Sequence, residues 1–129
     1  MSDNADLSEI DAVFQDYVEG INRQDVAGVA RLFSYPAVMG TVGQPLIAVP
    51  DAEVYRGFIA NTLEQFRARG WQRTEIDRQQ VVVTAGDAAF IAVDFSRYRH
   101  DGGLLDRGRA TYVMLRRAGR WTLVSAMAA

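Results

Sequence analysis

The sequence contains no cysteine and only one histidine, His100, among its 129 residues. Without thiols the chain has no disulfide framework, no thiol nucleophile and no thiolate metal site, and a single imidazole makes a typical zinc site hard to assemble. The sequence also has no Walker loop, dinucleotide-binding glycine motif or HExxH motif. We therefore expect a protein that works without a metal ion or a cofactor.

Long apolar runs and an excess of one charge are missing as well. The longest apolar stretches, such as Ala88–Val93, fall far short of the roughly 20 residues that cross a bilayer. Sixteen acidic and fourteen basic residues give a net charge of -2, which creates no overall field for nucleic acid or acidic membranes. The N-terminus, Met1–Asn4, lacks the basic-then-apolar layout of a secretion signal. These features predict a cytoplasmic protein with neither a nucleic-acid nor a membrane partner.

What remains is the composition of an ordinary globular domain, with 49% hydrophobic and 23% charged residues. The chain has the length of one domain, and no internal repeat or linker-like run divides it. We therefore expect a single domain over residues 1–129.

Apolar residues recur at helical spacing in the first half of the chain. The first stripe consists of Ile10, Val13, Phe14, Tyr17, Val18 and Ile21. This spacing predicts a helix over about Leu7–Asn22. A second, short helix of about two turns is expected after Asp25 as its N-cap, and a third helix between an Asp51 cap and Gly70. The extended residues between the second and third helices indicate a small two-stranded piece.

From Trp71 onward the apolar residues alternate with a period of two, which indicates strands. The expected strands are Trp71–Thr84, Ala88–Arg99, Arg107–Arg117 and Trp121–Met127. Three helices followed by a four-stranded meander predict an α+β fold, with the helices packed on one face of a mainly antiparallel sheet.

The register of the long strands divides the side chains between the two faces of this sheet. A two-residue turn at Gly102 and Gly103 places Asp94 opposite Thr111. The mixed polar face then carries Phe90, Ala92, Asp94, Ser96, Tyr98, Arg107, Arg109, Thr111, Val113 and Leu115. The apolar face carries Ile91, Val93, Phe95, Ala110, Tyr112 and Met114. We assign the mixed face to the helices and the apolar face to a second copy of the chain, which predicts a homodimer. The alternative is that the helices cover the apolar face and the mixed face is wet.

Three segments of the chain carry a resemblance to a known family. They are residues 13–33 (VFQDYVEGINRQDVAGVARLF), residues 56–63 (RGFIANTL) and residues 110–121 (ATYVMLRRAGRW). Together with the order of the elements, they resemble the nuclear transport factor two-like superfamily, which includes ketosteroid isomerases and SnoaL-like polyketide cyclases. The resemblance implies a cystatin-like cone with a curved sheet, an internal pocket under the helices, and dimerisation through the outer sheet face. It also implies that Asp94 and Thr111 face the pocket.

The departures from the isomerases bear on the activity. Tyr17 matches the tyrosine that those enzymes carry on the first helix. The acid that they carry on a long strand falls on Thr111, and their proton-moving base falls on Thr41. Their two further tyrosines fall on Phe33 and Ile59. We therefore expect no double-bond isomerase activity from this chain.

The candidate catalytic residues are Asp94 and Tyr17. In a cofactor-independent isomerase, cyclase or dehydratase-type reaction Asp94 would move the proton, while Tyr17 and Thr111 would stabilise negative charge on a ligand oxygen. Arg109 would tune Asp94 or hold a ligand anion. The other expected ligand-binding residues are Met39, Phe58, Tyr35 and Tyr98. Each residue also has a structural interpretation: Asp94 and Arg109 as an ion pair, and Tyr17 as a core aromatic.

The leading hypothesis is a dimeric protein that binds a small, largely apolar ligand carrying a carbonyl, hydroxyl or carboxylate group. The alternative is a non-catalytic module for ligand binding, dimerisation or interaction with another protein. His100 shares the strand parity of Asp94 but lies beside the glycine turn, so an exposed turn residue is the favoured interpretation.

Overall fold

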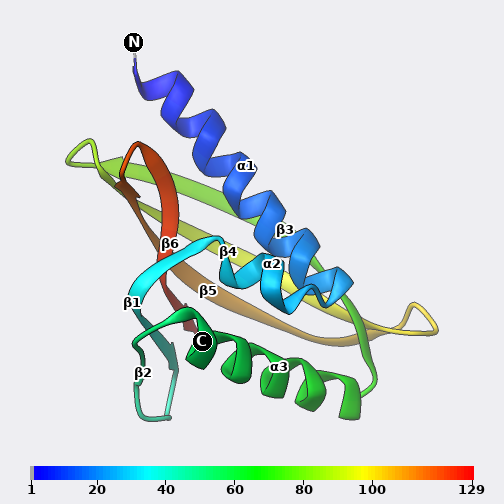
Figure 1. The fold of residues 1–129 in the computed structure, drawn as a ribbon. Coiled ribbons are helices and arrows are strands. Elements are labelled where there is room, and N and C mark those ends of the chain that lie inside the picture. Colours follow the sequence, from blue (N-terminus) through cyan, green and yellow to red (C-terminus); the bar gives the residue numbers. More distant parts are fainter. Residues whose placement is uncertain (1) are drawn as a thin grey trace.

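The computed structural model describes residues 2–129, with side chains described from Asp6 onward. Within that range the elements are α1 (Ser2–Arg23), α2 (Val26–Ala30), β1 (Phe33–Thr41), β2 (Ile47–Val49), α3 (Ala52–Ala68), β3 (Trp71–Thr84), β4 (Ala88–Arg99), β5 (Leu104–Arg117) and β6 (Arg120–Ala128). The helices lie on one side of a strongly curved sheet (Figure 1). The predicted α+β fold is confirmed.

The strands form one open sheet in the order β2-β1-β6-β5-β4-β3. Strands β3 to β6 form the expected antiparallel meander, and β2 pairs antiparallel with β1. Strand β1 pairs in parallel with β6, a contact that the sequence pattern did not predict. The long strands curve around the helices (Figure 1).

Helices α2 and α3 begin where their capping residues predict, whereas α1 begins at Ser2, before the expected start at about Leu7. The Asp25 carboxylate accepts a hydrogen bond from the Gly28 backbone N–H at 3.0 Å, and the Asp51 carboxylate accepts one from the Val54 N–H at 2.9 Å. Helix α2 is shorter than expected, with five residues, because Phe33 already pairs with β6 as the first residue of β1. Among residues 2–129, no helix combines the length and the apolar character needed to cross a membrane.

The helices cover the apolar face of the sheet rather than the mixed one. Ile91, Val93 and Met114 are at most 3% exposed beneath the helices, whereas Phe90 on the opposite face is 43% exposed. The prediction that the mixed face lies under the helices is therefore wrong. Covering the more apolar face removes more hydrocarbon from water, and it leaves the charged side chains of the mixed face hydrated.

The pairing of β4 with β5 is shifted by two residues from the expected register. Asp94 pairs with Arg109, and Thr111 pairs with Ala92. The connection is longer than a two-residue turn, since β4 ends at Arg99 and β5 begins at Leu104, and the ladder is irregular at Arg97. A shift of two residues changes which residues pair but leaves each side chain on the same face of the sheet. The wrong choice of the covered face therefore does not result from the wrong register.

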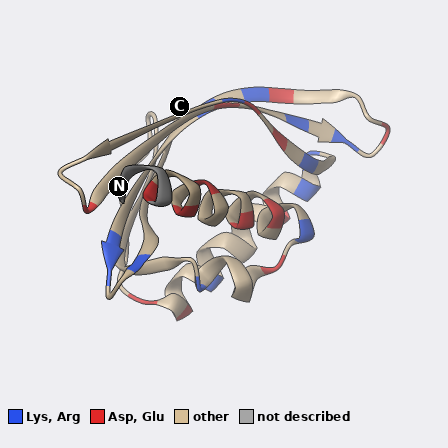
Figure 2. Cartoon of the chain, turned by 90° about the horizontal axis from the view of Figure 1, so that it is seen from above, with Lys and Arg blue, Asp and Glu red and all other residues tan. Residues whose placement is uncertain are grey.

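The argument for a homodimer depended on an uncovered apolar face, and the helices cover that face. Dimerisation through the outer sheet face stays a prediction without this support. The charged residues suggest no single binding face: acidic residues recur on the turns of α1, while basic residues lie mainly in the strands and loops (Figure 2).

Candidate functional site

A cavity of about 780 Å³ lies between helices α1 and α3 and the covered face of the sheet. Its walls are mainly apolar and aromatic, and it follows α3 from Tyr55 to Phe66. Tyr17, Met39 and Phe58, three of the residues expected at the pocket, line it. Their roles in binding stay predictions.

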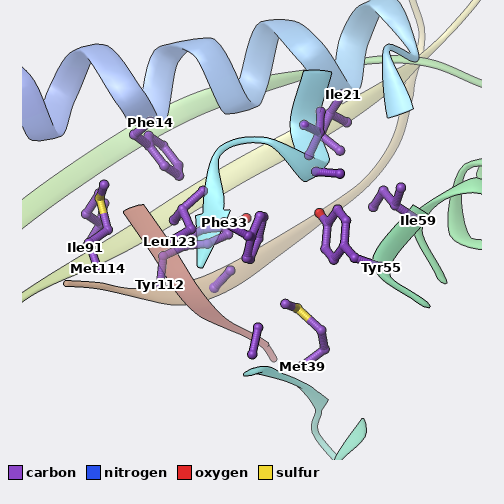
Figure 3. Packing of buried hydrophobic residues seen from close by; sticks show 14 of the residues in the cluster. Phe14, Ile21, Phe33, Met39, Tyr55, Ile59, Ile91, Tyr112, Met114 and Leu123 are labelled. Atoms are coloured by element: carbon purple, nitrogen blue, oxygen red, sulfur yellow. The ribbon is translucent and has the colours of Figure 1, made fainter. Parts of the chain in front are cut away.

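Three tyrosines from different elements meet at this cavity: Tyr17 of α1, Tyr55 of α3 and Tyr112 of β5. We call them the tyrosine cluster. The ring centroids of Tyr17 and Tyr112 are 5.3 Å apart. The ring of Phe33 contacts both Tyr17 and Tyr55, with centroid distances of 6.2 Å and 4.5 Å. Figure 3 shows the Tyr55 side chain reaching from α3 toward Phe33. Residues far apart in the sequence therefore place three phenols at one pocket.

Burial raises the pKa of all three phenols in the tyrosine cluster. The neighbouring Tyr112 hydroxyl opposes this effect on the pKa of Tyr17, whereas the Tyr17 hydroxyl adds to it for Tyr112. All three hydroxyls are thus protonated at neutral pH. They can donate hydrogen bonds to a ligand, but they do not supply a phenolate base.

Arg97 of β4 is the charged residue that lines the cavity within the described part of the chain. Its side chain is only 18% exposed, and its Nη1 donates to both carboxylate oxygens of Asp106 at 3.2 and 3.3 Å. The guanidinium stacks on two aromatic rings, with its Cζ 4.4 Å from the centroid of Phe66 and 4.6 Å from that of Phe95. Its positive charge reaches the cluster, since it lowers the pKa of Tyr17 and Tyr112 against the larger effect of burial.

Gly108 of β5 makes room for one of these two rings. A Cβ at this position would lie 2.5 Å from Cζ of Phe95, so any larger residue would push the ring away. The ring of Phe95 therefore lies over the backbone of the neighbouring strand, where it supports the Arg97 guanidinium. Arg97 was not predicted at the pocket, although its shared parity with the buried Val93 and Phe95 could have placed it there.

The polar residues predicted to line the pocket on the long strands lie on the outer face instead. Asp94 and Arg109 form an ion pair of 3.2 Å, with side chains that are 39% and 81% exposed, and Thr111 is exposed beside them. The prediction that these three residues face the pocket is wrong, because the helices cover the more apolar face of the sheet and leave the charged face hydrated. The alternative of an ion pair between Asp94 and Arg109 describes what the structure shows, although the pair is not buried.

Neither Tyr35 nor Tyr98 is among the described residues that line the cavity. The Tyr35 hydroxyl donates to the backbone carbonyl of Ala30 at 2.8 Å, so it connects β1 to α2. The ring of Tyr98 lies under the guanidinium of Arg73 at 4.4 Å. His100 is exposed in the turn after β4, where the favoured interpretation placed it.

The polar groups around the cavity define the chemistry that it can support. The charged or phenolic groups are hydrogen-bond donors, and amides from Asn61 and Gln65 of α3 add donors and acceptors. Among the described residues that line the cavity there is no Asp, Glu or His. The described residues also contain no group of three or more His, Asp or Glu side chains that could hold a metal ion. The arrangement is suited to holding a ligand that presents oxygen acceptors.

Three helices over one face of an open, curved sheet, with a pocket between the layers, define a cystatin-like α+β protein of the nuclear transport factor two-like class. The chain belongs to the family described as NTF2-like protein (DUF6841), whose model matches residues 8–129. The resemblance read from the sequence is thereby confirmed. No curated protein matches the chain.

Solved structures show the same fold at low sequence identity. An NTF2-like protein with a cystatin-like fold from Novosphingobium aromaticivorans is 18% identical, with 96% of this chain and 80% of that chain covered and a TM-score of 0.78. A protein of unknown function from Nostoc punctiforme is 14% identical, with 96% and 90% covered and a TM-score of 0.79. A ketosteroid isomerase-like protein from Erwinia carotovora atroseptica is 19% identical, with 97% and 95% covered and a TM-score of 0.71. At these identities the likeness shows a shared fold.

Proposed function

We propose that the protein binds a small, largely apolar molecule whose carbonyl or hydroxyl oxygen accepts a hydrogen bond from the tyrosine cluster. The observation that carries the proposal is the meeting of three protonated phenols at a cavity whose other walls are mostly apolar. Burial of the ligand's hydrocarbon in such a cavity supplies affinity, at about 25 cal/mol per Å². A few well-placed donors then fix its orientation.

Tyr17 and Tyr112 are the two adjacent candidate donors for this oxygen. Both side chains line the cavity and their ring centroids are 5.3 Å apart, so a ligand oxygen in this part of the cavity could accept from either hydroxyl. The same pair would stabilise negative charge that develops on a bound carbonyl oxygen.

Ligand binding, rather than proton transfer, is the part of the expected function that the geometry supports. Asp94, the expected proton carrier, lies on the outer face, and the described lining residues offer no other carboxylate or imidazole. Our proposal therefore takes the non-catalytic alternative as its starting point.

The test compares two probes of similar shape, the ketone 2-acetylnaphthalene and the hydrocarbon 2-ethylnaphthalene, by isothermal titration. The ketone should bind more tightly to the natural protein. Tyr17→Phe and Tyr112→Phe should each weaken ketone binding by about 0.5 to 1.5 kcal/mol and leave hydrocarbon binding unchanged, since each removes one neutral hydrogen bond. Tyr98→Phe, outside the cavity, is the matched control and should change neither. Equal affinities of the natural protein for the two probes would contradict the proposal.

A further inference from the structure

We propose that the natural ligand of the pocket is an organic carboxylate, and that Arg97 binds its carboxylate group. This inference rests on the proposed function and adds the charge of the ligand to it.

The charges around Arg97 leave a positive balance. Asp106, its partner, also accepts a hydrogen bond from Nη2 of Arg69 at 2.8 Å, so two guanidinium groups share one carboxylate. The side chain of Arg69 is half exposed, whereas that of Arg97 is largely buried at the cavity. No acidic residue stands among the described lining residues to balance the remaining charge. A ligand anion would neutralise it.

Part of the Arg97 guanidinium is left without a protein hydrogen bond among the described residues and could bind a ligand carboxylate. Phe66 and Phe95 hold the group by contacts with their rings, and Nη1 makes the hydrogen bonds to Asp106. Within the described residues the hydrogen bonds of the Arg97 side chain use this one nitrogen, which leaves Nε and Nη2 to form the parallel pair that a carboxylate accepts. Because the rings shield the guanidinium from bulk water, its attraction for an anion is less screened than that of a surface arginine.

The shape of the cavity indicates the rest of the molecule. Arg97 lies against Phe66, at one end of the stretch of α3 that the cavity follows, and Tyr55 lies at the other end. That stretch is about 16 Å long at the helical rise of 1.5 Å per residue. A carboxylate on Arg97 would therefore direct an elongated apolar body along α3, toward the tyrosine cluster.

The experiment compares decanoate with decan-1-ol, which has the same chain length and no charge, by isothermal titration. For the natural protein we expect decanoate to bind at least about tenfold more tightly, as a charge-assisted pair of hydrogen bonds predicts. Arg97→Gln should remove this preference and leave the affinity for decan-1-ol within about twofold. Arg109→Gln removes an arginine from the outer face and is the matched control, with no change expected in either affinity.

Two further variants keep the test decisive if Arg97→Gln folds poorly. Asp106→Asn should tighten decanoate binding severalfold, since it removes the anion that competes for Arg97, and should not affect decan-1-ol. Arg97→Lys should retain part of the preference, because it keeps the charge without the planar fork. Circular dichroism and the melting temperature report whether each variant is folded.

The outcomes separate this inference from the proposed function. Equal affinities of the natural protein for decanoate and decan-1-ol would overturn the role of Arg97, as would equal weakening of both probes by Arg97→Gln or weaker decanoate binding in Asp106→Asn. If 2-acetylnaphthalene still binds in a manner that depends on Tyr17, the proposed function stands while the carboxylate is excluded. If none of these probes binds, both proposals fail.

Discussion

The two faces of strand β4 are built from adjacent residues and have opposite environments. Ala89, Ile91 and Val93 point to the helices and are at most 3% exposed, while Phe90, between the first two, is 43% exposed on the outer face. One of the large aromatic residues of the chain thus lies on the side of the sheet that faces water. The comparison teaches that a single hydrophobic residue does not identify the covered face; the summed apolar area of the whole face does.

Ion pairs on the two sides of the sheet show the same contrast. Arg97 and Asp106 are 3.2 Å apart, and so are Arg109 and Asp94. The first pair has side chains that are 18% and 25% exposed, and the second has side chains that are 81% and 39% exposed. Water screens the second pair, so equal distances do not imply equal energies.

The largest expected difference between the faces comes from truncation of neighbouring residues on β4. Ile91→Ala should lower the free energy of unfolding by about 2 to 5 kcal/mol, because it leaves a cavity under the helices. Phe90→Ala should cost about 1 kcal/mol or less, since the ring is half in water. Urea denaturation of both variants measures the difference. Equal losses of unfolding free energy in Ile91→Ala and Phe90→Ala would show that the outer face is covered in solution.

A second comparison concerns two acidic residues. Asp6 is buried and accepts hydrogen bonds from Nη1 of Arg116 at 3.0 Å and from Nε1 of Trp121 at 3.2 Å, which tie α1 to β5 and β6. Asp6→Ala should destabilise the protein by about 1 to 3 kcal/mol, because the indole N–H loses its partner in a dry site. Asp94→Ala should cost less than about 1 kcal/mol. A loss for Asp94→Ala as large as that for Asp6→Ala, measured by urea denaturation, would contradict the exposed position of the outer pair.

Alkaline pH should destabilise the covered side of the sheet through the tyrosine cluster. Burial raises the pKa of Tyr17, Tyr55 and Tyr112 in the folded protein, so these phenols ionise more readily in the unfolded chain. Their contribution to stability is complete below pH 10, the ordinary tyrosine value, and is lost as pH rises above it. At pH 10.5 each phenol should account for at most about 0.8 kcal/mol of lost stability, the limit reached when it does not ionise in the folded protein.

Tyr112→Phe should reduce this alkaline loss by about one tyrosine's share, which urea denaturation at pH 8 and pH 10.5 can measure. The sequence contains no lysine, so no lysine side chain titrates in the same range. Absorbance at 295 nm gives an independent check, since the three phenols should ionise together with unfolding. An unchanged pH dependence in Tyr112→Phe would show that its phenol is hydrated in the folded state.

Much of the fold could be predicted from the sequence because the elements depend on local patterns. Both Trp71–Thr84 and Ala88–Arg99 were predicted with the bounds that the structure has, since their alternation is interrupted by a clear turn. The Asp25 and Asp51 caps were predicted because a helix N-terminus needs a side-chain acceptor within three residues. The parallel pairing of β1 with β6 was missed because it joins distant segments that no local pattern connects.

The candidate site was predicted less well, because it depends on which face of the sheet packs against the helices. Tyr17, Met39 and Phe58 were placed at the cavity from the helical stripe and the family resemblance. Asp94 was placed there because the mixed face of the sheet was assigned to the helices and the resemblance supported that assignment, yet hydration of the charge outweighs any gain from burial without a close partner. Assigning the other face of the sheet to the helices would have placed Tyr112 and Arg97 at the cavity instead.

The position of β6 has a consequence for how the molecule assembles. This strand comes last among the strands along the chain but lies in the middle of the sheet, between β1 and β5. Until residues 120–128 have been synthesised, the β1–β2 hairpin and the β3–β5 meander have no strand to join them. We therefore expect the nascent chain to acquire its cooperative stability late, in a step that closes long-range contacts and is correspondingly slow.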